Sequence, residues 1–249
     1  MNSGPVFEKY EEQGSEFCVP EGTVRIGELA FSGADTLEKL VIPDSVEEIG
    51  NYAFMNCYSL REIRLPERVV RLGAGLFQNC WQLRSVRLPE GTVTLGTDMF
   101  ENCHALTEII IPGSLEQAAR TSLSGCRSLR KIHIRPEQLM LLPPSARYTA
   151  ALTYMEDRSA GVEGSGSSGT EIIDSYVRER QKSFLDLAIN RKSPEAVKYM
   201  LEHGLADEEA LREYIEKSVN SGRTEITALL LDSLKDSNRS GGLSEDPFA

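Results

Sequence analysis

The stretch of sequence that decides the fold is Tyr52-Ala53-Phe54-Met55-Asn56-Cys57-Tyr58-Ser59-Leu60-Arg61-Glu62-Ile63-Arg64-Leu65-Pro66. Its pattern returns at steps of 23 residues on both sides. The recurring columns are represented in this copy by Ile49-Gly50, Phe54, Cys57, Leu60 and Pro66. Five copies fill residues 24–136. One copy cannot bury its apolar face alone, so the copies must stack and share a core.

Each copy contains a short stretch with the alternation of a β-strand. In the first copy, Leu40 and Ile42 alternate with Lys39 and Val41. The first pair is expected to face the core and the second pair to face solvent. Neighbouring parallel strands lie about 4.8 Å apart, so the five copies predict a solenoid of short parallel strands.

The ends of the repeat differ from its middle. Phe17-Cys18-Val19-Pro20 lies 23 residues ahead of the first predicted strand and predicts a capping strand within an N-terminal cap, residues 1–23. The fifth copy has Leu123 in place of the phenylalanine and Ala119 in place of the glycine. Such departures are expected of a terminal repeat, which has a different neighbour.

Two columns of small residues predict turns. One column contains only glycine and asparagine, which tolerate positive φ best, and predicts a left-handed residue in each copy: Gly33, Asn56, Asn79, Asn102 and Gly125. The other column predicts a second tight bend: Gly27, Gly50, Gly73 and Gly96.

The cysteines predict a column of buried thiols. Cys57, Cys80, Cys103 and Cys126 follow the 23-residue step, so none belongs to the closely spaced pair of a zinc site. Strands about 4.8 Å apart would place successive thiols within disulfide range. A reduced column that fills small spaces in the core is the favoured interpretation, and it indicates a reducing compartment.

The repeat resembles the BspA-like leucine-rich repeat family, a bacterial class with 23-residue units. The motif of residues 52–66 is nearly a copy of that family's consensus. The resemblance implies a leucine-rich-repeat solenoid and a role in binding. With the helices predicted after the repeat, the fold class is α+β.

After Pro136 the 23-residue period stops. Residues 137–160 predict a flanking helix, with Ser145 as the N-cap. Residues 161–170, rich in glycine and serine, predict a flexible linker. Residues 237–249 are polar and predict a disordered tail.

Between the linker and the tail, residues 171–236 have the 3.6-residue period of helices. Four helices are predicted: 171–190, 194–203, 207–220 and 223–235. Residues 187–201 align with residues 217–231 at an offset of 30, and Ser193 is expected to cap the second helix. The stretch Glu195–Gly204 resembles the second helix of an ankyrin repeat, so this segment is interpreted as ankyrin-like helical repeats.

Charge and hydropathy limit the function classes. The formal net charge is -11, which argues against nucleic-acid binding, since phosphates require a basic surface. The first residues have no apolar core typical of a secretory signal, and no apolar run is long enough to span a membrane. These features predict a cytoplasmic protein, whereas a signal sequence ahead of Met1 would place it at the cell surface.

No motif in the sequence indicates catalysis or a cofactor. His104, His133 and His203 lie near no recognised nucleophile, and neither a zinc-protease nor a hydrolase motif occurs. The first two are predicted on the outside of the repeat, and the third at the end of a helix, where a cation is favoured. We therefore expect neither an enzyme nor a bound metal or cofactor.

The candidate binding residues lie in and near one column of the repeat. The position after the cysteine is occupied by Asp35, Tyr58, Trp81, His104 and Arg127, so large planar side chains would stack on adjacent turns. Tyr, Trp and Arg are enriched at interface hot spots. The candidate set is Tyr58, Trp81, His104, Arg61, Arg64, Arg84 and Arg87.

These residues predict a noncatalytic adaptor that binds a protein partner through the strand face, the helical module or both. The alternative is an adhesive module that binds a glycan or a matrix protein, and an enzyme is the third hypothesis. If the same side chains have no binding role, they form a solvated face with surface ion pairs.

Overall fold

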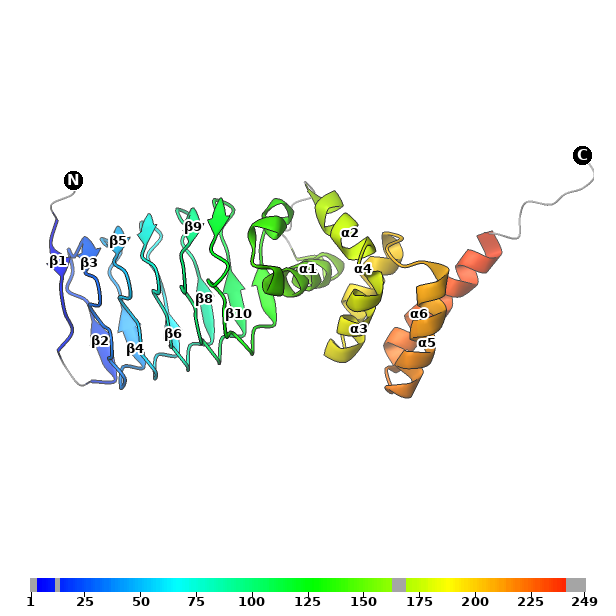
Figure 1. The fold of residues 1–249 in the computed structure, drawn as a ribbon, viewed down its shortest axis with the longest axis horizontal. Coiled ribbons are helices and arrows are strands. Elements are labelled where there is room, and N and C mark those ends of the chain that lie inside the picture. Colours follow the sequence, from blue (N-terminus) through cyan, green and yellow to red (C-terminus); the bar gives the residue numbers. More distant parts are fainter. Residues whose placement is uncertain (1–3, 12–13, 163–168, 241–249) are drawn as a thin grey trace, which may run out of the picture. The chain divides into compact units, whose positions relative to one another are not determined.

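The computed structural model describes residues 4–11, 14–162 and 169–240. It divides the chain into two units between Ala150 and Ala151, each with its own internal contacts. All strands belong to the first unit, which ends within helix α1, and the second unit is helical (Figure 1). Most of the predicted linker, residues 163–168, and most of the predicted tail, residues 241–249, lie outside the described residues.

The first unit is the predicted solenoid. One short strand from each turn joins a parallel six-stranded sheet, built from β2 (Glu16–Cys18), β4 (Lys39–Val41), β6 (Glu62–Ile63), β8 (Ser85–Arg87), β10 (Glu108–Ile110) and β12 (Lys131–His133). Phe17 pairs with Leu40, and Leu40 with Ile63, so the register equals the sequence repeat. The predicted capping strand is confirmed as β2.

A second set of strands was not predicted from the sequence. The parallel sheet β1–β3–β5–β7 runs along the upper edge of the first unit in Figure 1. Its members are β1 (Val6–Phe7), β3 (Arg25–Ile26), β5 (Glu48–Ile49) and β7 (Arg71–Leu72), and the pair β9 (Thr94–Leu95) and β11 (Gln117–Ala118) follows. Two-residue strands are too short to show an alternating pattern in the sequence.

Phenylalanine rings fill the interior of the solenoid. Phe54, Phe77 and Phe100 are 0% exposed, and their ring centroids lie 5.4 Å and 5.3 Å apart in a stack. Phe31 precedes them at 5.6 Å. Since each of the first four turns contributes one ring at the same place, and the fifth contributes Leu123, the core is continuous from turn to turn.

The cysteines form the predicted buried column. Each thiol donates a hydrogen bond to the carbonyl of the phenylalanine 26 residues earlier, as Cys57 does to Phe31 at 3.2 Å and Cys80 to Phe54 at 3.1 Å. Burial raises the pKa of Cys57 to about 12. Cys18, outside this column, is exposed.

The left-handed turn column is confirmed. Its residues have φ between +59° and +80°: Gly33, Asn56, Asn79, Asn102 and Gly125. The asparagines also form a ladder of side-chain amides that the sequence did not predict. Asn79 donates to Asn56 at 2.8 Å and Asn102 donates to Asn79 at 3.0 Å.

The second glycine column begins the predicted tight bend, since the Ala30 N–H donates to the Gly27 carbonyl and the Met99 N–H to the Gly96 carbonyl, both at 3.4 Å. Among the glycines of this column none has a positive φ. A Cβ at Gly73 would lie 2.5 Å from Asn51 Cα, and a Cβ at Gly50 would lie 2.6 Å from the Glu28 nitrogen. Glycine is needed there because neighbouring turns approach too closely for a side chain.

A second set of residues with positive φ lies two places after this glycine column, at positions where the sequence shows no enrichment in glycine. They are Leu29, Tyr52, Gly75 and Asp98.

The flanking region contains two elements where the sequence predicted one helix. A 3₁₀ helix, Pro136–Leu141, precedes α1 (Pro144–Ser159). Because α1 begins at Pro144, Ser145 lies inside the helix and is not its N-cap, whereas proline is well suited to a first turn. Buried Gln138 closes the last turn of the solenoid by donating to the carbonyl of Pro112 at 2.8 Å.

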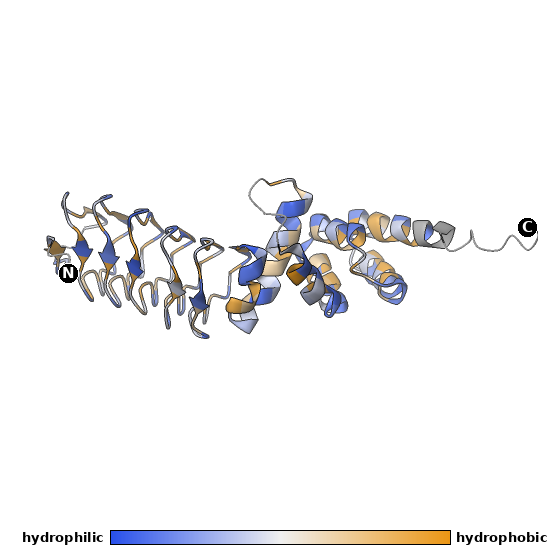
Figure 2. Cartoon of the chain, turned by 90° about the horizontal axis from the view of Figure 1, so that it is seen from above, coloured by the Kyte–Doolittle hydropathy of each residue, from blue (hydrophilic) through white to orange (hydrophobic). Residues whose placement is uncertain are grey.

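The second unit contains five helices after α1 in the described part of the chain. They are α2 (Thr170–Arg178), α3 (Gln181–Arg191), α4 (Pro194–Glu202), α5 (Glu208–Asn220) and α6 (Thr224–Ser240). Hydrophobic and hydrophilic residues occupy different sides of these helices (Figure 2). Helix α6 continues to Ser240, four residues into the predicted tail.

The predicted helix 171–190 is wrong, because the chain breaks it between α2 and α3. Arg180 has φ -127° and ψ 24°, outside the helical region. Ile173 and Val177 of α2 are buried, as are Phe184 and Leu185 of α3. A straight helix could not fold α2 back against α3, so tertiary packing overrides the local helical pattern.

The 30-residue repeat is visible in the turns that join the helices. Ser193 N–H donates to the Ala188 carbonyl at 2.9 Å, and Arg223 N–H donates to the Ser218 carbonyl at the same distance. The α3–α4 and α5–α6 pairs therefore end their first helices in the same way. The predicted cap is also confirmed, since the Ser193 hydroxyl accepts from the Ala196 N–H at 3.4 Å.

Candidate interaction surface

The three predicted planar side chains form a ribbon on adjacent turns of the solenoid. The rings of Tyr58 and Trp81 lie 4.3 Å apart between centroids at an interplanar angle of 37°. Trp81 and His104 follow at 6.4 Å and 20°. We name these three residues the aromatic ribbon. Each belongs to the turn that leads into a strand of the six-stranded sheet.

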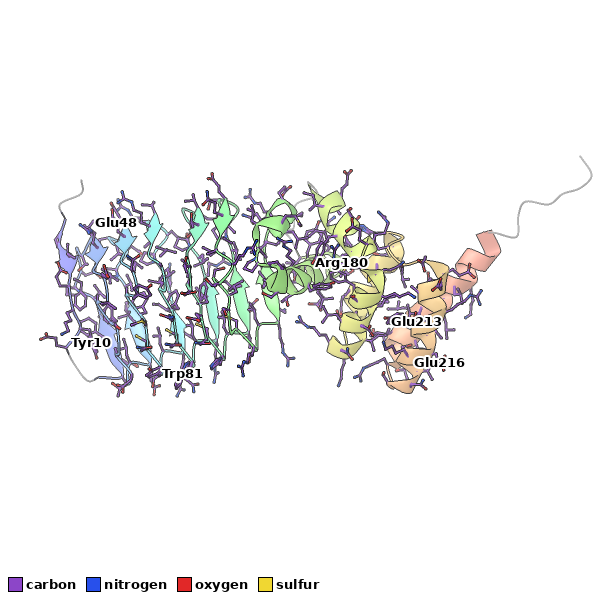
Figure 3. The ribbon with its side chains drawn as sticks, viewed as in Figure 1. Tyr10, Glu48, Trp81, Arg180, Glu213 and Glu216 are labelled. Atoms are coloured by element: carbon purple, nitrogen blue, oxygen red, sulfur yellow. The ribbon has the colours of Figure 1, made fainter. Side chains whose placement is uncertain are left out.

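The aromatic ribbon is accessible and fixed. Trp81 is 46% exposed and points outward from the lower edge of the first unit in Figure 3. The ring of His104 lies 3.1 Å from the Gly125 carbonyl through Nδ1, which ties it to the next turn. Since each ring rests on a rigid turn, little side-chain freedom remains to be lost when a partner binds.

Two of the four candidate arginines adjoin the aromatic ribbon in sequence. Arg61 and Arg84 each occupy the position just before a strand, three residues after Tyr58 and Trp81. Arg61 forms an exposed ion pair with Glu38 at 3.6 Å. Such a pair in water contributes little to stability, so Arg61 can exchange it for a partner's carboxylate at low cost.

The other two arginines line a separate groove. Arg64, just after β6, and Arg87, the last residue of β8, line an open groove of about 900 Å³ formed with residues of β4, β6 and β8. None of the three rings of the aromatic ribbon lines it. The structure therefore separates the seven predicted residues into two sets, the ribbon with Arg61 and Arg84, and the groove with Arg64 and Arg87.

One side of the groove is acidic, which the sequence analysis missed. Its carboxylates follow the proline of successive turns at the 23-residue step and are Glu21, Asp44 and Glu67. The signal was present in the sequence as a proline followed by an acidic residue in each of the turns that line the groove. The groove thus presents both signs of charge.

The remaining candidates for chemistry have structural partners. His133 lies 2.7 Å from Glu108 through Nε2, and His203 at the end of α4 lies 3.1 Å from Asp174. Within the described ranges, no group of three or more His, Cys, Asp or Glu side chains could hold a metal ion. No helix among those residues is long and apolar enough to cross a membrane.

The sequence of the chain matches a known family. A family model of the BspA type leucine rich repeat region matches residues 10–143 in six copies. The six-stranded sheet likewise has one strand more than the five predicted turns, because β2 precedes them. No curated protein matches the chain.

Solved structures share the solenoid. A leucine rich cell surface protein from Faecalibacterium prausnitzii A2-165 is 32% identical with a TM-score of 0.52, over 54% of this chain and 37% of that one. A leucine-rich repeat protein from Eubacterium ventriosum ATCC 27560 is 24% identical with a TM-score of 0.50, over 52% of this chain and 37% of that one. The second likeness shows the fold alone.

The chain thus spans little more than a third of either protein. These comparisons include leucine-rich repeat proteins and no catalytic family. The family match covers more than half of the residues and includes all six strands of the six-stranded sheet. The chain belongs to the BspA type leucine rich repeat family.

Proposed function

We propose that the chain is a noncatalytic interaction protein whose aromatic ribbon binds a protein partner. The observation that carries the proposal is Trp81, which is nearly half exposed yet held in a stack with Tyr58 and His104. Tryptophan and arginine dominate the energetics of protein interfaces. Arg61 and Arg84 supply charge-assisted hydrogen bonds beside the rings.

The packing of the rings favours a protein over a glycan. Tyr58 comes from the preceding turn and His104 from the following one, so both faces of Trp81 have a neighbouring ring. A sugar that stacks on tryptophan needs an open ring face, whereas protein side chains can contact ring edges as well. Tyr58, whose ring centroid lies 4.3 Å from that of Trp81, leaves less of the Trp81 face open to a sugar.

The second candidate function is adhesion at the cell surface. It is favoured by the Faecalibacterium prausnitzii relative, which is described as a cell surface protein and is 32% identical. The buried column of thiols favours a reducing compartment such as the cytoplasm instead. In either location the aromatic ribbon is the proposed contact surface.

The test is a comparison of partner binding between the full chain and Trp81→Ala/Arg84→Ala. Proteins captured from a lysate of the native host on the immobilised chain would be identified, and the affinity of each purified protein would be measured by calorimetry. We expect the double variant to lose about 2 kcal/mol or more of binding free energy, the loss typical of a hot spot.

A matched variant controls for the loss of exposed side chains. Val93→Ala/Arg120→Ala removes an exposed apolar side chain and an exposed arginine elsewhere on the same unit. It should bind the partner as the unmodified chain does. The affinity of Arg87→Ala for the partner tests separately whether the groove takes part in binding. If the folded Trp81→Ala/Arg84→Ala variant binds with unchanged affinity, the aromatic ribbon is not the site.

A further inference from the structure

The α3–α4 pair holds the α5–α6 pair through an apolar strip. Leu185 and Ile189 of α3 are 0% and 2% exposed, and Val197 of α4 is 0% exposed. Helix α3 packs against α5, and α4 packs against α6. The Ile189 carbonyl also accepts from the Arg223 guanidinium at 3.2 Å. The outer face of the first pair is therefore covered by the second.

Two charged residues of α3 flank this strip and bind α5. Asp186 accepts a hydrogen bond from the Tyr214 hydroxyl at 2.9 Å and pairs with Lys217. Lys182 pairs with Glu213 at 2.9 Å and with Glu209 at 3.2 Å. The face that receives α5–α6 thus carries a cation, an acid and an apolar strip along one helix.

At an offset of 30 residues, α5 repeats the α3 part of this apolar strip, while Thr227 of α6 occupies the position of Val197. Ile215 and Val219 occupy the positions of Leu185 and Ile189. Ile189 is 2% exposed, but Val219 is 57% exposed, and Leu231 of α6 is 39% exposed. Among the described residues, no helix pair covers this face.

The charged residues are repeated as well. Arg212 occupies the position of Lys182, and Glu216 occupies the position of Asp186. Glu216 lies on the exposed side of α5 (Figure 3). Within the described part of the chain its carboxylate has no hydrogen-bond or ion-pair partner, whereas Arg212 pairs only within its own helix, with Glu208.

We propose that the outer face of α5–α6 binds a helix pair of a partner protein. The first helix of that pair presents a hydroxyl or an ammonium group to Glu216 and carboxylates to Arg212, as α5 does to Asp186 and Lys182. Its apolar side covers Val219 and Leu231. This site lies outside the solenoid and does not depend on the proposed role of the aromatic ribbon.

A synthetic peptide with the sequence of residues 203–240 is the probe, because α5–α6 is itself a helix pair that fits this type of face. The high effective concentration of the intramolecular pair prevents the added peptide from displacing it. We expect a fluorescent form of the peptide to bind the full chain, with the affinity measured by polarisation.

Three variants of the chain identify the face. Val219→Asp should weaken peptide binding by about thirtyfold or more, the change typical of a hot spot. Glu216→Lys should weaken it by about fivefold, as expected for an exposed ion pair, and a peptide carrying Lys217→Glu should restore binding. Glu225→Lys, the same charge reversal at an exposed position of α6 off this strip, should have no effect.

A grafted chain keeps the test decisive if the free peptide does not fold. In this variant, a second copy of residues 203–240 is joined directly after Asp232. Asp232 is equivalent to Glu202 at the 30-residue offset, so the added helix pair follows α6 as α5–α6 follows α4. The added pair should resist proteolysis and raise the unfolding temperature of the helical unit, and Glu216→Lys should reduce that gain. Digestion of the added pair with the parent chain intact would overturn the proposal.

Other occupants of the face give different results. If the full chain sediments as a dimer and Val219→Asp makes it monomeric, a second copy occupies the face. If the peptide binds only a chain that ends at Ser240, residues 241–249 occupy it. Binding that is insensitive to both Val219→Asp and Glu216→Lys places the peptide elsewhere. Each of these three results would overturn the proposal.

Discussion

The glycines at the close approach between turns allow a matched pair of substitutions. A Cβ at Gly73 would lie 2.5 Å from Asn51 Cα, but a Cβ at Gly96, one turn later, would meet nothing closer than Ala74 Cα at 3.3 Å. Neither glycine has a positive φ, so alanine can adopt both backbone conformations. Gly73→Ala and Gly96→Ala therefore differ in space alone.

The size of each effect follows from two opposing terms. Replacing glycine by alanine restricts the unfolded chain and stabilises the folded state by about 0.4–1 kcal/mol. At Gly73 the new methyl group must push apart two backbones, and overpacking of this kind costs about 1–3 kcal/mol. We expect Gly73→Ala to lower the free energy of unfolding by about 1–2 kcal/mol, and Gly96→Ala to change it by less than about 0.5 kcal/mol.

Urea denaturation followed by tryptophan fluorescence measures both values. Trp81 is the single tryptophan of the chain and lies in the solenoid, so its emission reports the first unit without the helices. The two variants should have the same dependence on urea and different midpoints. Equal destabilisation by both substitutions would refute the close approach as the reason for this glycine column.

Further predictions concern the core and the end of the solenoid. Phe77→Ala should cost about 3–5 kcal/mol in urea denaturation, because it removes a ring stacked on both sides. A thiol reagent should label only Cys18 in the native protein and all five cysteines after denaturation. The pKa of the Cys57 thiol rises from 9.0 to about 12 on folding, so the stability that it contributes is complete below pH 9 and is lost as the pH rises toward 12. In a series of unfolding curves across this pH range, the free energy of unfolding of Cys57→Ala should therefore decline less than that of the unmodified protein. Gln138→Ala should cost about 1–3 kcal/mol by leaving buried carbonyls without a donor, measured as a shift of the urea midpoint.

The solenoid could be predicted because each structural position is sampled several times in the sequence. The spacing of Leu40 and Ile63 gives the register of the sheet, and the restriction of one column to Gly and Asn gives the left-handed turn. A single occurrence of either signal would have been ambiguous. Repetition converts weak local preferences into a defined fold.

The features that were missed depend on approach between segments, which composition does not show. Gly73 is needed for clearance from the preceding turn, and the sequence, which predicted only a bend at this column, did not show it. Similarly, nothing in the residues around Arg180 breaks a helix. The break exists because α2 must pack against α3.

The sequence predicted which candidate residues are neighbours on adjacent turns of the solenoid, but not which ones are neighbours within a single turn. The period places Tyr58 beside Trp81, and their rings do stack. The path of the chain around one turn decides which residues of the same copy are neighbours. For this reason Arg87, six residues after Trp81, lies in the groove and not beside the ring.

The ladder of Asn56, Asn79 and Asn102 joins only adjacent turns, as the thiol–carbonyl bonds also do. Every such link spans between 23 and 26 residues, however many turns the solenoid has. Removal or duplication of one complete 23-residue unit therefore reconnects equivalent partners. Gene rearrangement can lengthen or shorten this protein in whole units without a new search for long-range contacts, and folding need not slow as the chain grows.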